Sequence, residues 1–181
     1  MTVIDRDGLH GGAEQVESPN CDDRPPGTAV TLVVLHAISL PPGEFGSDAI
    51  ARLFTNRLDA AAHPSFPGLA SLRVSAHFLV RRGGELVQFV PVHRRAWHAG
   101  VSRWRGRERC NDFSVGIELE GTDERGFSEA QYARLPELVR ALRAALPLRE
   151  IAAHSDIAPD RKTDPGGTFD WSRLFADLAR A

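Results

Sequence analysis

The run of residues 30–38, VTLVVLHAI, constrains the fold more than any other segment of this chain. Its residues are apolar and β-branched almost without interruption, which is typical of a strand buried on both faces. The breaker-rich segment SLPPGEFG follows directly and predicts a loop. We therefore expect residues 30–38 to form a central strand whose sheet is covered on both sides.

Further strands are expected around this central one. Two apolar segments flank the turn Gly83-Gly84 and predict a β-hairpin. Another segment, FSVGIELE, alternates apolar with polar residues, and a short apolar segment precedes His154. The expected strands are 74–82, 85–92, 113–120 and 150–153.

Three helices are expected between and after these strands. The first runs from Asp48 through Arg57, the second over 128–146 with Ser128 as N-cap, and the third over 170–181 with Asp170 as N-cap. Pro136 should kink or divide the second helix, since proline removes a backbone hydrogen bond. The order of elements predicts an α/β fold of α+β type, in which helices flank one central mixed sheet.

Length and composition indicate one domain. The chain has 181 residues, which suits a single compact unit. Residues 1–28 are polar and rich in Gly, Pro and Asp, so we expect an N-terminal arm that wraps the domain or stays mobile, followed by one domain over 29–181. Cys21 and Cys110 stand in no metal-binding spacing and indicate no disulfide framework.

Charge and hydropathy exclude two classes of partner. The 22 basic and 24 acidic residues give a net charge of −2, so no nucleic-acid surface is expected. The longest apolar run is far shorter than the ~20 residues of a membrane-spanning helix, and the N-terminus has no secretory signal. We expect a cytoplasmic monomer. Among the 22 basic residues only Lys162 is lysine, and a compact ammonium is not readily replaced by arginine.

Two of the seven histidines stand at positions typical of functional sites. His36 and His154 each end a predicted core strand just before an irregular loop, and Asp164 follows ten residues after His154. Two histidines and a carboxylate form a typical catalytic zinc set that leaves a fourth position open. A histidine near a strand is more often structural, and the spacing alone does not decide between the two readings.

Acid–base candidates lie on the strand 113–120 and in the loop before Asp164. Glu118 and Glu120 share one face of that strand by its period of two, and either could equally be a solvent-facing residue. Lys162 lies two residues before Asp164, so an extended loop would turn both side chains the same way. His77 is expected to pack or hydrogen-bond within its strand, whereas His10 and His63 lie in polar loops and are expected to have no special role.

Long segments of the chain resemble the zinc-dependent N-acetylmuramoyl-L-alanine amidases, a family that includes peptidoglycan recognition proteins. The resemblance covers about residues 20–171 and is strongest for the cytoplasmic members that act on 1,6-anhydro-muropeptides. It is carried by VVLHAISLPPGEFG (33–46), LRVSAHFLVRRGGELVQFVPVHRRAWHAGVS (72–102), GRERCNDFSVGIELEGTD (106–123), HSDIAPDRKTDPG (154–166) and FDW (169–171).

The resemblance implies a metal site and a catalytic pair. It implies that His36, His154 and Asp164 bind Zn²⁺. It also implies that Glu118 moves protons as a general base and acid, and that Lys162 stabilises the oxyanion. The implied substrate is an anhydro-muropeptide, cleaved between N-acetylmuramic acid and the L-alanine of the stem peptide during peptidoglycan recycling.

Other matched positions suggest contacts beyond the metal. Arg73 and Arg109 resemble residues that contact carboxylates of the stem peptide. His98, in WHAG, is expected to pack near the pocket or support it. Ala37 departs from the asparagine that commonly follows the first histidine in the family, so an amide contact to substrate is absent. Two alternatives stay open: a peptidoglycan-binding module without catalysis, and an endolysin-type amidase directed at the wall.

Overall fold

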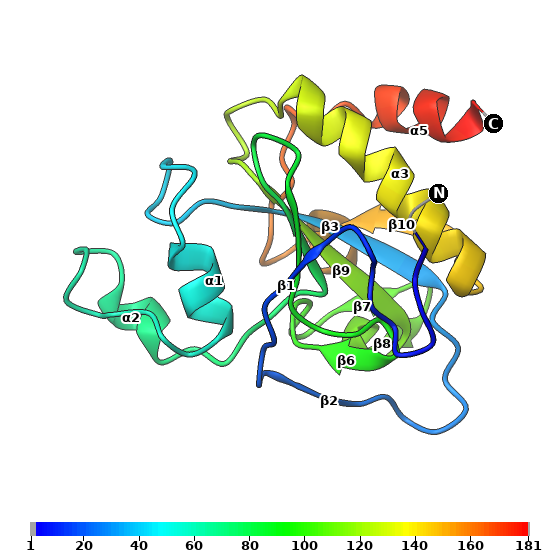
Figure 1. Ribbon diagram of the computed structural model, residues 1–181, viewed down its shortest axis with the longest axis horizontal. Coiled ribbons are helices and arrows are strands. Elements are labelled where there is room, and N and C mark those ends of the chain that lie inside the picture. Colours follow the sequence, from blue (N-terminus) through cyan, green and yellow to red (C-terminus); the bar gives the residue numbers. More distant parts are fainter. Residues whose placement is uncertain (1–2, 181) are drawn as a thin grey trace.

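The strand expected at the centre of the fold is β3, Leu32–Ile38, which lies inside a six-stranded mixed sheet. The computed structural model describes residues 3–180. The sheet has the order β1-β5-β4-β9-β3-β10 (Figure 1). Its other strands are β1 (Glu14–Gln15), β4 (Phe78–Val80), β5 (Leu86–Gln88), β9 (Ser114–Glu120) and β10 (Glu150–Ala153).

The side chains of β3 explain why its sequence is apolar at consecutive positions. Val33 and Leu35 belong to the core under the long helix α3 (Glu129–Ala145). Leu32 and Val34 face the opposite core, which contains Ile157. All four are at most 1% exposed. Because both faces of the strand are covered, its pattern is continuous instead of alternating.

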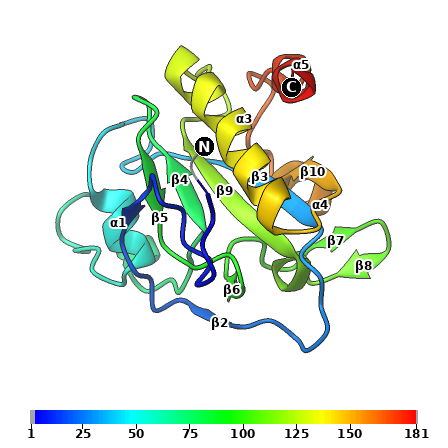
Figure 2. The same ribbon diagram turned by 45° about the vertical axis from the view of Figure 1, so that its right-hand side comes forward.

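The helices are arranged in layers on the sheet. Figure 1 and Figure 2 show α3 running across one face with α5 (Trp171–Ala179) beside it. On the other side, α1 (Ala49–Phe54) packs Ile50 and Leu53 in one core with Leu79 of the β4–β5 hairpin. Two four-residue helices complete the set, α2 (Pro67–Ala70) and α4 (His154–Ile157). The predicted α/β fold with a mixed sheet and flanking helices is confirmed.

Two short strand pairs lie outside the six-stranded sheet. β2 (Cys21–Asp23) pairs antiparallel with β6 (Arg94–Ala96), and β7 (Arg103–Trp104) pairs antiparallel with β8 (Arg107–Glu108). A 3-10 turn, η1 (Cys110–Phe113), leads into β9. Both cysteines are free, and no helix among residues 3–180 is long and apolar enough to cross a membrane.

Helix boundaries follow the expected caps with two differences. Ser128 forms a capping box with Gln131 at the start of α3, as its sequence predicts. The prediction that Pro136 could divide α3 is wrong. The helix continues through this residue, because Leu135 and Leu138 are buried in the core on either side of it. The first helix ends at Phe54 instead of position 57, since Asn56 has a left-handed backbone with φ of 59°.

The N-terminal residues lie along the domain. β1 adds a parallel edge strand beside β5, and β2 pairs with β6. Arg24 fixes the segment after β2: its guanidinium donates to four backbone carbonyls, those of Asn111, Asp112, Val92 and Ser114, at 2.9–3.1 Å. Burial lowers the pKa of Arg24 to about 10, so the group stays charged at neutral pH.

Replacing Arg24 by methionine is expected to lower the free energy of unfolding by roughly 3 kcal/mol, because buried carbonyl groups lose a charged donor. Urea denaturation followed by circular dichroism would measure the change. Arg52→Met is the matched control, since Arg52 is about half exposed and forms only an i,i+4 pair with Asp48. Equal effects of the two substitutions would contradict an anchoring role for Arg24.

Candidate metal and catalytic site

Three of the predicted site residues meet at the carboxyl end of the central strands. β3 and β10 are parallel neighbours, with Leu35 opposite Ala153. His36 is the next residue on β3, and His154 is the next residue after β10 and begins α4. Asp164 reaches the same place from the following loop, whose backbone is tied back by a hydrogen bond from the Ser155 amide to the Asp164 carbonyl.

The three side chains present one donor atom each to a common centre. The two Nδ1 atoms of His36 and His154 are 2.9 Å apart, and Asp164 Oδ2 lies 3.3 Å from the first and 3.1 Å from the second. Both imidazoles are almost completely buried. A tetrahedral ion with bonds of about 2.0–2.1 Å spaces its ligand atoms by roughly 3.3 Å, which is close to these separations. Among residues 3–180, these three form the group able to hold a metal ion.

The electrostatics of the cluster suit metal binding. Burial lowers the pKa of His36 to about 4, although donation of a hydrogen bond to the Asp164 carboxylate acts in the opposite direction and raises it. For Asp164, burial alone would favour the neutral acid, but hydrogen bonds with His154 and His36 hold its pKa below the usual range. At neutral pH the site therefore offers a neutral imidazole and an ionised carboxylate, the protonation states that ligands require.

Glu118 lies directly beside the cluster. β3 and β9 are parallel, and their register places Glu118 opposite His36. Burial raises the pKa of the Glu118 carboxyl well above its usual value, the Asp164 carboxylate raises it further, and the Lys162 ammonium lowers it. A buried carboxyl group with a raised pKa is typical of a residue that exchanges protons near neutral pH.

Lys162 stands in the loop between His154 and Asp164. Its backbone amide donates to the Ala158 carbonyl at 3.0 Å, and its side chain is partly buried. The Lys162 charge also contributes to lowering the pKa of His36. The only lysine of the chain is therefore close enough to act electrostatically on both Glu118 and the metal-binding cluster.

Glu120 has a different environment from Glu118 although both lie on one face of β9. Its carboxylate accepts hydrogen bonds from the backbone amides of Gly46, at 2.6 Å, and Arg82, at 3.1 Å. It is 1% exposed and fully engaged in holding the 41–47 loop and the β4–β5 turn. Of the two carboxylates that the sequence could not separate, only Glu118 is free of such structural bonds among the described residues.

Arg73 and Arg109 are not joined to this cluster by any contact within residues 3–180. The exposed Arg73 guanidinium folds back onto the carbonyls of Ser71 and Leu72 at 3.2 Å. Arg109 has a left-handed backbone, with φ of 61°, and its guanidinium is 3.3 Å from Asp112. It borders a surface cavity of about 710 Å³ between residues 100–109 and 156–161.

Two further histidines, His77 and His98, lie near the cluster or its strands. His77 is structural: its Nδ1 accepts from the Gly116 amide and its Nε2 lies 3.1 Å from the Arg94 carbonyl. His98 lies behind a candidate ligand, with its Nδ1 2.9 Å from Nε2 of His36. The WHAG segment marked His98 as near the pocket but did not show which residue it contacts.

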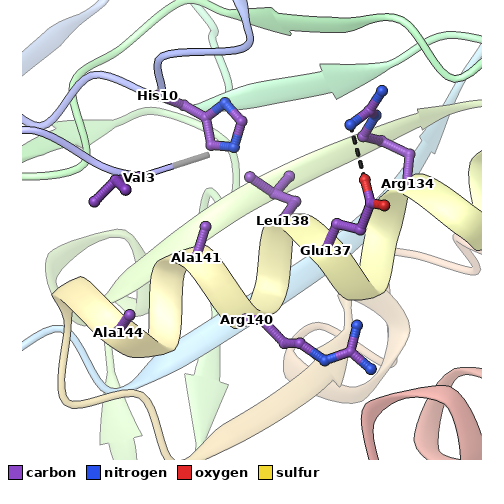
Figure 3. A pocket seen from close by; sticks show the side chains of 8 residues that line it. All are labelled: Val3, His10, Arg134, Glu137, Leu138, Arg140, Ala141 and Ala144. Atoms are coloured by element: carbon purple, nitrogen blue, oxygen red, sulfur yellow. Dashed lines mark hydrogen bonds and ion pairs between the residues drawn. The ribbon is translucent and has the colours of Figure 1, made fainter. Parts of the chain in front are cut away.

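A separate groove lies on the α3 face of the molecule. It has a volume of about 550 Å³ and runs between the N-terminal residues Val3 and His10 and the helical residues Leu138 and Ala141. Figure 3 shows the Arg134–Glu137 ion pair, 2.8 Å long, along its edge. None of the predicted site residues lines this groove.

The raised pKa of Glu118 has a consequence for stability. The pKa of Glu118 is higher in the folded than in the unfolded protein. Below the unfolded pKa, ~4.3 for glutamate, the carboxyl group is neutral in both states and its burial has no electrostatic cost. As the pH rises from there through the folded pKa, the free energy of unfolding falls. Glu118→Gln should therefore stabilise the metal-free protein at pH 7.5. The gain should vanish near pH 4. Urea denaturation with a chelator at both pH values measures this, and a gain that is independent of pH would contradict the assignment.

Comparison with known proteins identifies the relatives of this chain. The profile of the N-acetylmuramoyl-L-alanine amidase family matches residues 26–167. The chain is 58% identical over 165 residues to 1,6-anhydro-N-acetylmuramyl-L-alanine amidase AmpD of Escherichia coli (strain K12), covering 90% of each chain. A crystal structure of a selenomethionine AmpD derivative superposes with a TM-score of 0.95 at 52% identity, covering 98% of this chain and 99% of that one.

A more distant solved structure shows a bound substrate. The amidase AmiD from E. coli, in complex with anhydro-N-acetylmuramic acid-L-Ala-D-γ-Glu-L-Lys, gives a TM-score of 0.61 at 27% identity. The match covers 97% of this chain and 65% of that one. With the family profile spanning most of the sequence, the chain belongs to the N-acetylmuramoyl-L-alanine amidase family.

Proposed function

We propose that this amidase uses zinc to cleave the amide bond between 1,6-anhydro-N-acetylmuramic acid and the L-alanine of the stem peptide, in cytoplasmic peptidoglycan recycling. The observation that carries the proposal is the convergence of His36, His154 and Asp164 beside Glu118. The extensive identity to AmpD and the substrate bound by AmiD support this choice of bond.

The donor set fits zinc. Two imidazole nitrogens and one carboxylate oxygen, without a thiolate, are a common ligand set of catalytic zinc, which keeps its fourth position open. In our proposal His36, His154 and Asp164 hold the ion. When bound, zinc supplies Lewis acidity that makes water acidic near neutral pH and polarises a carbonyl group.

The chain's own residues would supply the proton transfers and charge stabilisation. Glu118 takes a proton from the attacking water as its oxygen bonds to the carbonyl carbon. It then delivers that proton to the L-alanine nitrogen as the carbon–nitrogen bond breaks, which returns Glu118 to its ionised state. The Lys162 ammonium stabilises the negative charge on the former carbonyl oxygen between these two steps.

Recognition of the peptide is assigned to two arginines. We place Arg73 and Arg109 at carboxylates of the stem peptide, where a planar guanidinium can form two parallel hydrogen bonds. Both side chains are exposed and therefore accessible to a ligand. Ala37 presents no amide where relatives commonly have asparagine, so substrate affinity at this position depends on other groups. The enzyme is proposed to work as a monomer.

The direct test is mass spectrometry of products from anhydro-muramyl-tripeptide. Untreated protein should release free tripeptide, metal-free protein prepared with a chelator should lose this activity, and added Zn²⁺ should restore it. Full turnover by protein shown to be metal-free would contradict the zinc proposal. Absence of cleavage by zinc-loaded protein would instead favour a peptidoglycan-binding module.

The same assay on intact sacculi tests the cellular substrate. A recycling enzyme should act faster on the soluble anhydro-muropeptide than on polymeric wall. Activity confined to sacculi would contradict a recycling role and favour the endolysin-type alternative, although the bond cleaved would be the same.

A further inference from the structure

His98 lies beside His36 and is partly buried. Its Nδ1 is 2.9 Å from His36 Nε2, and the two rings are nearly perpendicular, with centroids 5.0 Å apart. On the other side of the ring, His98 Nε2 is 3.2 Å from Ser114 Oγ. His98 therefore joins a candidate metal ligand to the first residue of β9.

The position of His36 Nδ1 determines which atom donates and which accepts in each of these hydrogen bonds. His36 turns Nδ1 towards His154 and Asp164, and a nitrogen that binds a cation carries no proton. The ring proton of His36 is then on Nε2 and is donated to Nδ1 of His98. The proton of His98 is consequently on its own Nε2 and is donated to Ser114.

The chain of hydrogen bonds ends on the backbone. Ser114 Oγ donates its proton to the Cys110 carbonyl oxygen at 2.6 Å, and a carbonyl group can only accept. If these hydrogen bonds ran in the opposite direction, the Cys110 carbonyl oxygen would face a lone pair of Ser114 Oγ instead of its proton. The backbone of η1 thus sets the orientation of every donor back to His36.

The sequence leaves space for this arrangement at Gly116. A Cβ atom at that position would lie 2.4 Å from Cγ of His98. The two flanking residues of β9, Val115 and Ile117, carry branched side chains, so a residue without a side chain is required only where the imidazole lies against the strand. Gly116 lets the His98 ring pack directly on the β9 backbone.

We propose that His98 is a positioning residue that fixes the Nε2-protonated tautomer of His36, so that Nδ1 is the metal-binding atom. The inference rests on the proposed zinc site, because it concerns how one ligand of that site is held. Outer hydrogen-bond partners of this kind typically contribute about 10–100-fold to metal affinity. Packing alone would not distinguish between polar and apolar replacements of His98.

Asparagine and leucine at position 98 provide a matched pair. The two side chains have the same branched shape, but asparagine places Oδ1 where histidine has Nδ1 and so still accepts from His36. His98→Leu is expected to raise the Zn²⁺ dissociation constant, measured by competition with a chromophoric chelator, roughly 10–100-fold. His98→Asn should recover most of this loss. Equal affinity of both variants, weakened or not, would overturn the proposal.

Nuclear magnetic resonance of the unmutated protein gives a second measurement that does not require either variant to fold. Long-range proton–nitrogen spectra of the zinc-loaded protein should show His36 protonated at Nε2 with Nδ1 bound to the metal. The opposite tautomer would overturn the inference while leaving the zinc site intact. Failure of the unmutated protein to bind zinc would instead contradict the proposed function.

Discussion

Substitution of Glu118 by glutamine is expected to lower kcat by about 10²–10⁴ while zinc remains bound, because the amide cannot accept a proton from the attacking water. The register between β3 and β9 fixes Glu118 opposite His36, so no other carboxylate on this strand has an equivalent position. Steady-state hydrolysis of anhydro-muramyl-tripeptide, together with zinc content by atomic absorption, would measure the two quantities separately. Near-normal turnover with zinc bound would show that another group is the base.

Glu120→Gln is the matched control, since it makes the same chemical change on the same strand face. Glu120 accepts backbone hydrogen bonds from Gly46 and Arg82, and glutamine retains only one of the two carboxylate oxygens. This variant should unfold at lower temperature yet keep its turnover. The two glutamates would thus respond oppositely: Glu118→Gln gains stability at neutral pH and loses activity, and Glu120→Gln loses stability alone.

These two glutamates also show a limit of prediction from the sequence. The period of two places Glu118 and Glu120 on one face of their strand, and nothing in the pattern separates them. The distinction comes from which neighbours lie across the sheet, and those neighbours are more than 35 residues away in the chain. The central strand and the hairpin could be predicted, because their apolar patterns and the Gly83-Gly84 turn are local signals.

Segments without a local pattern were less accessible to prediction. β1 and β2 are polar two- and three-residue strands whose order depends on partners about 70 residues later. Arg24 belongs to a polar N-terminal segment without a structural pattern, and only the folded chain shows the four carbonyls around it. The expected division at Pro136 was wrong for the same reason, since tertiary packing of α3 outweighs a local breaker.

The metal-binding cluster could be predicted in part from the sequence. The ends of two apolar strands predicted His36 and His154 individually, because the carboxyl ends of parallel strands collect functional side chains. That the two strands are neighbours, with the register that brings their Nδ1 atoms to 2.9 Å, follows only from the sheet order. The contact from His98 to His36 likewise needs Gly116 and Ser114 of β9 to be in place.

Lys162→Arg is expected to reduce kcat by roughly 10²–10³, the loss typical of removing one oxyanion donor, although the charge is kept. Arginine spreads its charge over a planar fork, whereas the lysine ammonium is a compact charge that can approach a single oxygen. Lysine is retained here in a chain whose other 21 basic residues are arginine, so arginine at this position is the informative replacement.

Comparison of Lys162→Arg with Lys162→Met in the same hydrolysis assay distinguishes the effect of the positive charge on kcat from the effect of the shape of the side chain. If the position of the ammonium is what matters, both variants should lose similar amounts of kcat, retain zinc and change KM little, because the group acts after substrate has bound. If only a positive field is needed, the arginine variant should keep most of its turnover while the methionine variant does not. Because the Lys162 charge also holds down the pKa of Glu118, the methionine variant should require a higher pH for the activity that remains. Full turnover in both variants would remove Lys162 from the mechanism and leave oxyanion stabilisation to the metal site alone.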